Sequence, residues 1–446
     1  MLDQAKRIHL IGIGGIGLSG LAKLLLAQGK VLSGSDLQET PMTQDLEKRG
    51  IKIHYGHHLI NLDQEVDLII YSSAVPEINV ERAWAKERGI PERTYAQALG
   101  EFSKQYSTIV VTGTHGKSTT TAMLGLMLEA AGYDPTVLVG SLVPTFKEGN
   151  IRIGKSRFFV VEGCEYQANM LNLHPESIVL TNIEMDHPDF YRDIDHVRNT
   201  FKEFVDRLLG DGLVVMNADD PESRKLISDR SVTFGFDQSA QYRLEGNQVY
   251  RKEDGEKALG SFTLKIPGDF NKHNALAATA AAMELGVPFE ICKQTVEAFT
   301  GIWRRFEHVG VVGGVEVISD YGHHPTAMLS TVEAAQAFYP DRRIVLAFQP
   351  HQHARTKSLY HEFVQAFSKM MVPTILVEVY DVAGRNEDQS ISSNQIVKEV
   401  GRENLVFAKD LVEAERLIRE TIKPNDLLIV MGAGDIDSVA RKLGKG

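Results

Sequence analysis

A glycine turn that carries a lysine and hydroxyls lies between an apolar strand and a helical pattern at residues 108–124. The residues of this phosphate loop are Gly113, Thr114, His115, Gly116, Lys117, Ser118 and Thr119. Glycines let the backbone turn tightly and direct N–H groups at an anion, and the helix N-terminus adds partial positive charge. In such a loop the lysine reaches the β- and γ-phosphates and the first hydroxyl holds Mg²⁺. We therefore predict a nucleoside triphosphate site, with Lys117 on the phosphates and Ser118 on the metal.

The loop departs from the common phosphate-loop pattern at one position. The pattern G-x-x-x-x-G-K-[ST] expects glycine at position 111, where this chain has Val111. The alternative is a glycine turn with an incidental lysine. The position of the loop between a strand and a helix favours phosphate binding.

Two later strands end in residues that are able to hold a metal ion. The apolar run at 157–162 ends at Glu162, and the run at 177–181 leads to Asp186 and His187. Because parallel strands present their carboxyl ends at one sheet edge, we expect these groups near the phosphate loop. Glu162 would hold Mg²⁺, and His187, oriented by Asp186, would hold a second metal that neutralises charge on a transferring phosphoryl group. The alternatives are a surface acid and an ordinary loop histidine.

A second glycine cluster stands near the N-terminus. Gly12, Gly14 and Gly17 fit the pattern G-x-G-x-x-G, and Asp36 stands where dinucleotide-binding units place an acid on the ribose. Because a triphosphate loop follows later in the chain, we expect a nucleotide-linked substrate here rather than a nicotinamide cofactor. A tight turn without a ligand is the alternative.

Further polar residues lie near other helix starts and strand ends. Asn271 and Asn274 share a face of a helix start, where they would read an adenine edge, or Asn271 would simply cap the helix. Arginines such as Arg304 and Arg355 would stabilise charge on a phosphate. The histidine spacings match no usual zinc site, so His57 is expected at the surface or on substrate.

Three blocks of alternating strands and helices position these residues within 446 residues. We predict an α/β protein with a Rossmann-like N-terminal domain over 1–104. A central P-loop-type ATP-binding domain with a mostly parallel sheet would follow over 105–307, and a Rossmann-like C-terminal α/β domain over 308–446. In the central block, antiparallel strands are expected over 241–266 with a turn near Asp254, and a helix over 272–285.

The composition of the chain limits which partners and which cellular compartment we expect. A formal net charge of -11 argues against a nucleic-acid or anionic-membrane partner. Two cysteines fit a reducing compartment, and no apolar run approaches the roughly 18 residues of a membrane span. We therefore expect a cytoplasmic protein.

The ordered set of motifs resembles the Mur ligase family, the ATP-dependent amide-bond ligases of peptidoglycan synthesis. The segments that carry the resemblance span essentially the whole chain, at residues 12–17, 113–119, 181–187, 303–306, 320–326 and 348–351. The resemblance also accounts for Val111, because this family uses the Gly-Thr-His-Gly-Lys form of the loop.

The resemblance implies a reaction in which L-alanine joins the carboxylate of UDP-N-acetylmuramate through an acyl phosphate, with ATP and Mg²⁺. The residues that would contact the UDP-sugar are Gly14, Gly15, Gly17, Asp36 and Ser73. The phosphate loop, Asn271, Asn274 and Arg304 would bind ATP. The residues that would line the site where amino acid and γ-phosphate meet are Asp320, Tyr321, His323, His324, His351 and Arg355. Among the residues named, Lys117, Glu162, His187, His324 and Arg355 would be catalytic, and Ser118, Glu162 and His187 would hold metal.

Some positions depart from the family pattern, and two other functions stay open. Residues 162–165 read Glu-Gly-Cys-Glu instead of Glu-Ala-Asp-Glu, and Gln352 replaces an arginine, so a phosphate contact there rests on Arg355. Phe201 stands where related ligases carry a carbamylated lysine. The alternatives are a murein tripeptide recycling ligase and a catalytically silent nucleotide-binding regulator; either a monomer or a homodimer is expected.

Overall fold

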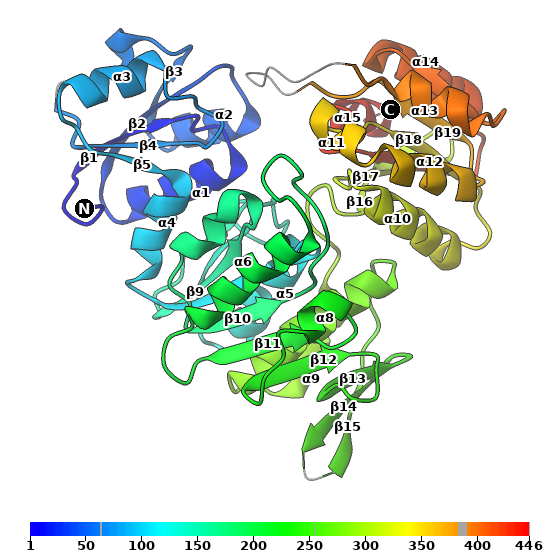
Figure 1. The fold of residues 1–446 in the computed structure, drawn as a ribbon, viewed down its shortest axis with the longest axis horizontal. Helices are drawn as coiled ribbons and strands as arrows, with labels where there is room; N and C mark the ends of the chain where they lie inside the picture. The colour runs from blue at the N-terminus through cyan, green and yellow to red at the C-terminus, as the bar shows by residue number, and fades with distance from the viewer. Residues whose placement is uncertain (63–64, 254, 382–389, 446) are drawn as a thin grey trace. The chain divides into compact units, whose positions relative to one another are not determined.

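The computed structural model describes residues 1–62, 65–253, 255–381 and 390–445. Its strands form three sheets of five, ten and six strands, and helices connect them (Figure 1). The predicted α/β class is confirmed. The chain divides into two compact units: the first is Met1–Glu184, Ile194–Thr263 and His273–Val296, and the second is Met185–Asp193, Leu264–Lys272 and Glu297–Gly446. The domain limits 1–104, 105–307 and 308–446 stay a prediction.

The first sheet is entirely parallel, in the order β3-β2-β1-β4-β5. Its strands are β1 (Arg7–Ile11), β2 (Val31–Asp36), β3 (Lys52–Tyr55), β4 (Leu68–Tyr71) and β5 (Glu92–Thr94). The helices of this block are α1 (Ile16–Ala27), α2 (Pro41–Lys48), α3 (Val80–Glu87) and α4 (Tyr95–Ser103), with a 3-10 turn at Leu59–Asn61. The strand order reverses at β1, so the glycine turn after β1 lies at the kind of crevice where nucleotides bind.

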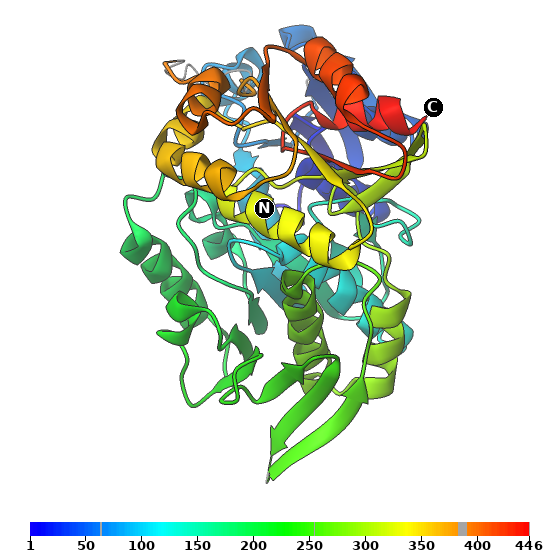
Figure 2. The same cartoon turned by 90° about the vertical axis from the view of Figure 1, so that its right-hand side faces the viewer.

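The second sheet runs in the order β15-β14-β13-β12-β11-β10-β6-β9-β7-β8. Its strands are β6 (Ser107–Thr112), β7 (Thr136–Leu138), β8 (Ile151–Arg152), β9 (Phe158–Gly163), β10 (Ser177–Leu180), β11 (Leu213–Asn217), β12 (Ser231–Gly235), β13 (Tyr242–Glu245), β14 (Gln248–Glu253) and β15 (Gly255–Ser261). The centre is parallel, whereas β8 and the β13-β14-β15 edge are antiparallel. Figures 1 and 2 show β14 and β15 as a two-stranded ribbon at the end of the sheet. The antiparallel edge was expected; Asp254, at its expected turn, lies outside the described residues.

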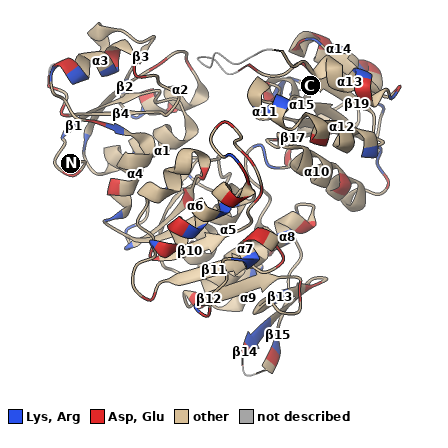
Figure 3. Ribbon diagram, in the orientation of Figure 1, with Lys and Arg blue, Asp and Glu red and all other residues tan. Residues whose placement is uncertain are grey.

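Five helices of the described chain accompany this sheet. They are α5 (Lys117–Ala130), α6 (Ile194–Asp206), α7 (Pro221–Arg224), α8 (Asp269–Glu284) and α9 (Phe289–Ala298), with 3-10 turns at Tyr166–Asn172. On α6 the buried residues recur at helical spacing and include Phe201, whereas Lys202 and Asp206 are exposed and pair with one another. Phe201 is therefore a core residue of α6. Figure 3 shows where basic and acidic residues lie along the helices of this sheet.

The third sheet has the order β16-β17-β21-β18-β19-β20. Its strands are β16 (Glu307–Val312), β17 (Val315–Asp320), β18 (Ile344–Phe348), β19 (Thr374–Val377), β20 (Leu405–Ala408) and β21 (Leu427–Met431). Its helices are α10 (Pro325–Phe338), α11 (His353–Ser358), α12 (Tyr360–Lys369), α13 (Ser393–Val400), α14 (Leu411–Thr421) and α15 (Asp437–Gly444). Two apolar clusters contain alternate residues of the same strands, such as Ile344 and Val345, so helices cover both faces. Among the described helices, none has the length and apolar character that a membrane crossing requires.

Candidate active site

The phosphate loop connects β6 to α5 through two glycines with positive φ. Gly116 has a φ of 84°, and a Cβ there would stand 2.1 Å from Asn274 Oδ1. Gly113 has a φ of 135°, and a Cβ there would stand 2.1 Å from Thr181 Oγ1. Both the turn and the close approach therefore require glycine.

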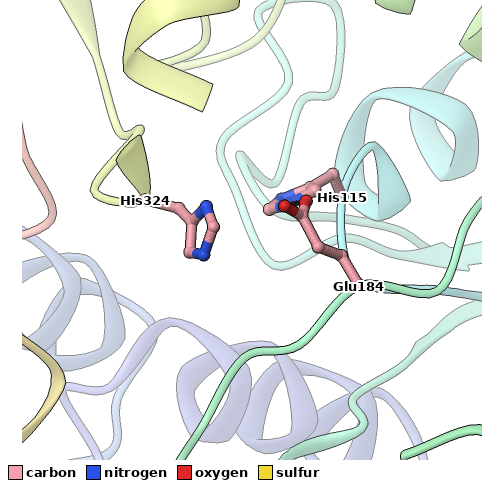
Figure 4. A group of neighbouring side chains, drawn as sticks. All are labelled: His115, Glu184 and His324. Carbon is pink, nitrogen blue, oxygen red and sulfur yellow. Dashed lines mark hydrogen bonds and ion pairs between the residues drawn. The ribbon is translucent and has the colours of Figure 1, made fainter. Parts of the chain in front are cut away.

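The loop is held by the segment that follows β10. His115 N donates to Asn182 Oδ1 at 2.9 Å, and Thr181 Oγ1 donates to the His115 carbonyl at 2.6 Å. The side chains of His115 and Glu184 point toward one another, with Nε2 and Oε2 2.8 Å apart (Figure 4). These bonds fix the loop before any ligand binds, which is the preorganisation that anion binding needs.

Lys117 lies over the loop, next to a buried acid. Its ammonium group donates to the carbonyls of Gly113 at 2.6 Å and Thr114 at 3.0 Å, and pairs with Glu165 at 2.8 Å. Burial alone would lower the pKa of Lys117, but the Glu165 carboxylate outweighs it and raises the pKa. Lys117 is therefore a cation at the N-terminus of α5.

Ser118 and Glu162 form a hard-oxygen pair beside the same helix. Ser118 Oγ donates to Glu162 Oε2 at 3.0 Å, and the other carboxylate oxygen accepts from Gly140 N. A hydroxyl and a carboxylate are ligands that Mg²⁺ prefers. Their donor chemistry therefore fits a magnesium ion.

Helix α8 contains three polar residues, Asn271, His273 and Asn274, that make different contacts. Asn274 packs its amide against Gly116. His273 Nε2 lies 2.7 Å from Asp219 Oδ2, and its ring lies against Phe236 at 3.9 Å between centroids. Asn271 is the third residue of α8 and donates to the Pro267 carbonyl at 2.6 Å. The helix-capping interpretation of Asn271 is wrong, because α8 begins at Asp269.

The second unit contains a buried ion pair between Asp186 and Arg355. Arg355 Nε donates to Asp186 Oδ1 at 3.1 Å, and both side chains are buried. Burial raises the pKa of Asp186, but the Arg355 charge and the neighbouring His187 and His323 outweigh it and lower it well below the usual range. Asp186 therefore anchors Arg355 as well as lying beside His187.

His187 has a backbone φ of 53° and lies against the same guanidinium group. Its Nδ1 stands 3.2 Å from Arg355 Nη2, which can only donate, so Nδ1 accepts and Nε2 carries the proton of the neutral ring. In this arrangement the imidazole offers a metal no lone pair on Nε2. A metal contact by His187 thus requires Arg355 to give up this bond.

Three further histidines belong to this unit: His323, His324 and His351. His323 is held by burial and the Arg355 charge at a pKa well below its usual range, so it is neutral. Its ring lies 5.9 Å from His351, which stacks on Tyr380 at 5.4 Å. His324 caps α10 and accepts from Thr326 N. Of the residues expected at the amino-acid site, His323, His351 and Arg355 thus lie together in this unit.

Asp320 and Arg304 hold the turn that leads into β16. The Asp320 carboxylate accepts from Phe306 N at 2.8 Å and Gly322 N at 2.7 Å, and burial raises its pKa. Arg304 has a φ of 55°, donates to the carbonyls of Gly432 and Gly434, and lies over the Tyr321 ring at 5.0 Å. Both side chains therefore form hydrogen bonds with backbone groups of this unit and so stabilise its fold.

The N-terminal glycine turn follows β1 and is held by Asp36 at the end of β2. Gly12 has a φ of 79°, and Asp36 Oδ2 accepts from Gly14 N at 2.8 Å. A Cβ at Gly17 would stand 2.9 Å from the Tyr95 ring. Ser73 is exposed beyond β4. The acid expected on a ribose therefore also fixes the turn itself.

Comparisons with known proteins agree along the whole chain. Three family models match: Mur ligase family, catalytic domain, at 7–107; Mur ligase middle domain at 111–282; and Mur ligase, glutamate ligase domain, at 304–434. The chain is 38% identical to a UDP-N-acetylmuramate–L-alanine ligase of Caldanaerobacter subterraneus subsp. tengcongensis, over 99% of this chain and 98% of the relative. The chain belongs to the Mur ligase family.

One more relative and two solved structures are similar to this chain along nearly its whole length. A UDP-N-acetylmuramate–L-alanine ligase of Clostridium novyi is 39% identical, over 97% of this Mur ligase and 96% of the relative. The crystal structure of a UDP-N-acetylmuramate-alanine ligase from Thermotoga maritima matches with a TM-score of 0.82 and 28% identity, over 98% of each chain. A murein peptide ligase from Psychrobacter arcticus matches with a TM-score of 0.73 at 23% identity, over 98% of each chain, and shows the shared fold.

Within each unit of this Mur ligase, the predicted residues gather into groups. Lys117, Ser118 and Glu162 lie together at one sheet edge, and His187, His323, His351 and Arg355 lie together in the second unit. The partners Glu165 and Glu184 were missed, although both stand inside quoted motifs. Their signal was a carboxylate within three residues of a predicted ligand. Catalytic and binding roles stay predictions.

Proposed function

We propose that this Mur ligase joins L-alanine to UDP-N-acetylmuramate at the expense of ATP, in peptidoglycan precursor synthesis in the cytoplasm. The observation that carries the proposal is 38–39% identity, along nearly the whole chain, to enzymes named for that reaction. The intact phosphate loop supports it, because Lys117, Ser118 and Glu162 are all present in a fixed arrangement. Two free cysteines, Cys164 and Cys292, fit a reducing compartment.

The chemistry has two steps. An oxygen of the muramyl carboxylate attacks the γ-phosphorus of ATP, and the bond to the bridging oxygen breaks to leave ADP and an acyl phosphate. The L-alanine nitrogen then attacks the acyl carbon, loses a proton, and expels inorganic phosphate as the amide forms. Both steps develop charge on oxygens, so fixed cations stabilise them most.

Residues of this chain have distinct tasks in that sequence. Lys117 binds the β- and γ-phosphates and stays charged throughout, since Glu165 raises its pKa. Ser118 and Glu162 would hold Mg²⁺, which would neutralise phosphate charge when bound. Arg355, anchored by Asp186, binds the transferring phosphoryl group or the carboxylate. The UDP-sugar binds at the Gly14–Gly17 turn with Asp36.

A substrate panel tests the proposal. Release of phosphate is measured with Mg-ATP and each combination of UDP-N-acetylmuramate, L-alanine and L-Ala-γ-D-Glu-diaminopimelate. We expect release only when UDP-N-acetylmuramate and L-alanine are both present. Equal release with the tripeptide would replace the proposal by the recycling reaction. Tight ATP binding without release under any condition would indicate a regulator. Sedimentation of the same sample decides between monomer and homodimer.

A further inference from the structure

A buried carboxylate below the N-terminal glycine turn has no part in the roles above. Glu81 is the second residue of α3 and is fully buried at 0% exposure. Asn79 caps the helix and accepts from Glu81 N at 2.9 Å. The helix N-terminus favours a negative charge, but a buried carboxylate still needs hydrogen-bond donors to stay ionised.

Both oxygens of Glu81 have such donors. Oε1 accepts from Asn61 Nδ2 at 2.6 Å and from His58 N at 3.2 Å, and Oε2 accepts from the Ser35 hydroxyl at 2.5 Å. Burial raises the pKa of Glu81, but these bonds and His9 outweigh it and hold the pKa at about 2. Glu81 is therefore an ion at neutral pH, with donors on both oxygens.

The Ser35 hydroxyl lies between Glu81 and His57 and forms a hydrogen bond with each. A hydroxyl has one proton, and Ser35 gives it to Glu81, so Ser35 Oγ accepts from His57 Nδ1 at 3.1 Å. His57 Nδ1 also lies 3.5 Å from Glu81 Oε2. The proton of the neutral imidazole is thereby held on Nδ1, which leaves the lone pair of Nε2 for a ligand.

The same residues hold the glycine turn. The Ser35 carbonyl accepts from Gly12 N at 2.8 Å, and the Asp36 carbonyl accepts from Gly56 N at 2.8 Å, directly before His57. Ser35 and Asp36 close β2, at the carboxyl edge of the parallel sheet where nucleotides bind. The Glu81 network and the expected UDP site therefore share one strand end.

We propose that Glu81 is a positioning residue for the UDP-sugar, acting through Ser35 to fix the tautomer and orientation of His57. His57 Nε2 then accepts a hydrogen bond from an N–H or hydroxyl of the uridine. This inference rests on the proposed function, in which this domain binds the UDP-sugar. His9 on β1 and His54 on β3 also face Glu81, so its variants are compared at one pH.

The first test replaces the carboxylate by an amide of the same shape. In Glu81→Gln one oxygen becomes an NH₂ group that faces donors, so His57 loses its fixed orientation. We expect the KM for UDP-N-acetylmuramate to rise about tenfold, with kcat and the KM values for ATP and L-alanine unchanged. Glu77→Gln is the matched control, because it removes the same charge from an exposed side chain just before α3. Equal changes in all three KM values would overturn the inference.

A double-mutant cycle separates positioning from a general loss of structure. In a His57→Ala background, Glu81→Gln is expected to add no further rise in KM, because His57 is the group through which Glu81 acts. Additive effects would overturn the inference. Ser35→Ala leaves Glu81 bonded to Asn61 and His58 N, so it serves if Glu81→Gln does not fold. It is expected to raise the same KM, and an unchanged KM would again overturn the inference.

The two proposals fail in different ways. A wild-type protein without phosphate release in the substrate panel would reject the proposed reaction. Normal wild-type release, with an unchanged KM for UDP-N-acetylmuramate in folded Glu81→Gln and Ser35→Ala, would reject only the role of Glu81.

Discussion

Two glycine-rich turns of this Mur ligase have the same backbone plan and different surroundings. Each follows a parallel strand, opens a helix and contains a glycine with φ near 80°, Gly12 in one and Gly116 in the other. The second turn has Lys117 against Glu165 and Ser118 against Glu162. The first has the Asp36 carboxylate on Gly14 N and the Tyr95 ring against Gly17.

Under the proposed function, the difference separates a turn that binds a diphosphate from a turn that supports phosphoryl transfer. Backbone N–H groups and a helix N-terminus suffice to bind a diphosphate that does not react. Transfer adds charge in the transition state, which requires a fixed cation and a metal site. Residues 12–17 contain no cation, whereas residues 113–118 contain both a lysine and a hydroxyl. Substitutions should therefore act on binding in the first turn and on the rate in the second.

The largest effect is expected at Lys117. Lys117→Met removes the cation, and with it the ion pair to Glu165. We expect kcat for phosphate release to fall by about 1,000-fold, with the KM for UDP-N-acetylmuramate unchanged. Lys104→Met, at an exposed helix end, is the control. A fall of less than tenfold would contradict the transfer role of this turn.

A smaller effect on rate is expected at Glu162. Glu162→Gln keeps an acceptor for Ser118 but removes the negative charge from the hard-oxygen pair. We expect kcat to fall about 100-fold, and the Mg²⁺ concentration for half-maximal rate to rise. The measurement is a Mg²⁺ titration of phosphate release, with the exposed Glu203→Gln as the control. An unshifted Mg²⁺ dependence would remove Glu162 from the metal site.

In the first turn the expected effect is on binding alone. Asp36→Asn still accepts from Gly14 N, but through a neutral oxygen, so the turn is held more weakly. We expect the KM for UDP-N-acetylmuramate to rise about fivefold at constant kcat and constant KM for ATP. Calorimetric titration with the UDP-sugar checks this, and the exposed Asp211→Asn serves as the control. A changed kcat would show that the two turns are not divided in this way.

The smallest effect concerns the stability of the first turn's domain. Glu101 on α4 accepts from Leu2 N and Arg93 Nε, both at 2.8 Å, and lies 3.3 Å from the N-terminal ammonium group. Burial raises the pKa of Glu101, but these partners outweigh it and hold the pKa at about 2. Because this pKa lies below its usual value, the stabilisation is complete above about pH 4.5 and is lost as the pH falls towards 2.

Glu101→Gln should therefore lower the free energy of unfolding of this domain by about 2 kcal/mol at pH 7, and by little near pH 2. Urea unfolding followed by Trp84 fluorescence measures it, in a Trp303→Phe background so that Trp84 in α3 is the sole reporter. A difference between the two proteins that does not change with pH would contradict the assignment of the pKa shift.

Local sequence patterns predicted the helices and strands better than they predicted which side chains pair with one another. Strands β9 and β10 were predicted to within one residue at each end, because short apolar runs bounded by polar residues mark their ends. Helix α8 begins three residues earlier than predicted, since Asp269 follows a glycine with positive φ and starts the helix there. The loop at 113–119 and its neighbour Glu162 followed from motif and strand order.

Side-chain pairs between residues far apart in the chain could not be predicted from the sequence. Asp186 was assigned to His187, its neighbour in the chain, and the structure adds Arg355, 169 residues away. Glu81 gave no signal at all, because a charged residue in the first turn of a helix usually indicates a solvated face. Its burial depends on how β2, β3 and α3 come together, which no local pattern encodes.

The path of the chain between the two units limits how this protein can be divided. Residues Met185–Asp193 and Leu264–Lys272 belong with Glu297–Gly446, although the chain before and after each belongs to the other unit. A fragment that began at residue 297 would lack Asp186, and with it the buried anchor of Arg355. Recombination at a single joint would therefore yield a module with an unpaired buried arginine. A swap of this unit between relatives would have to transfer three separate stretches of chain together.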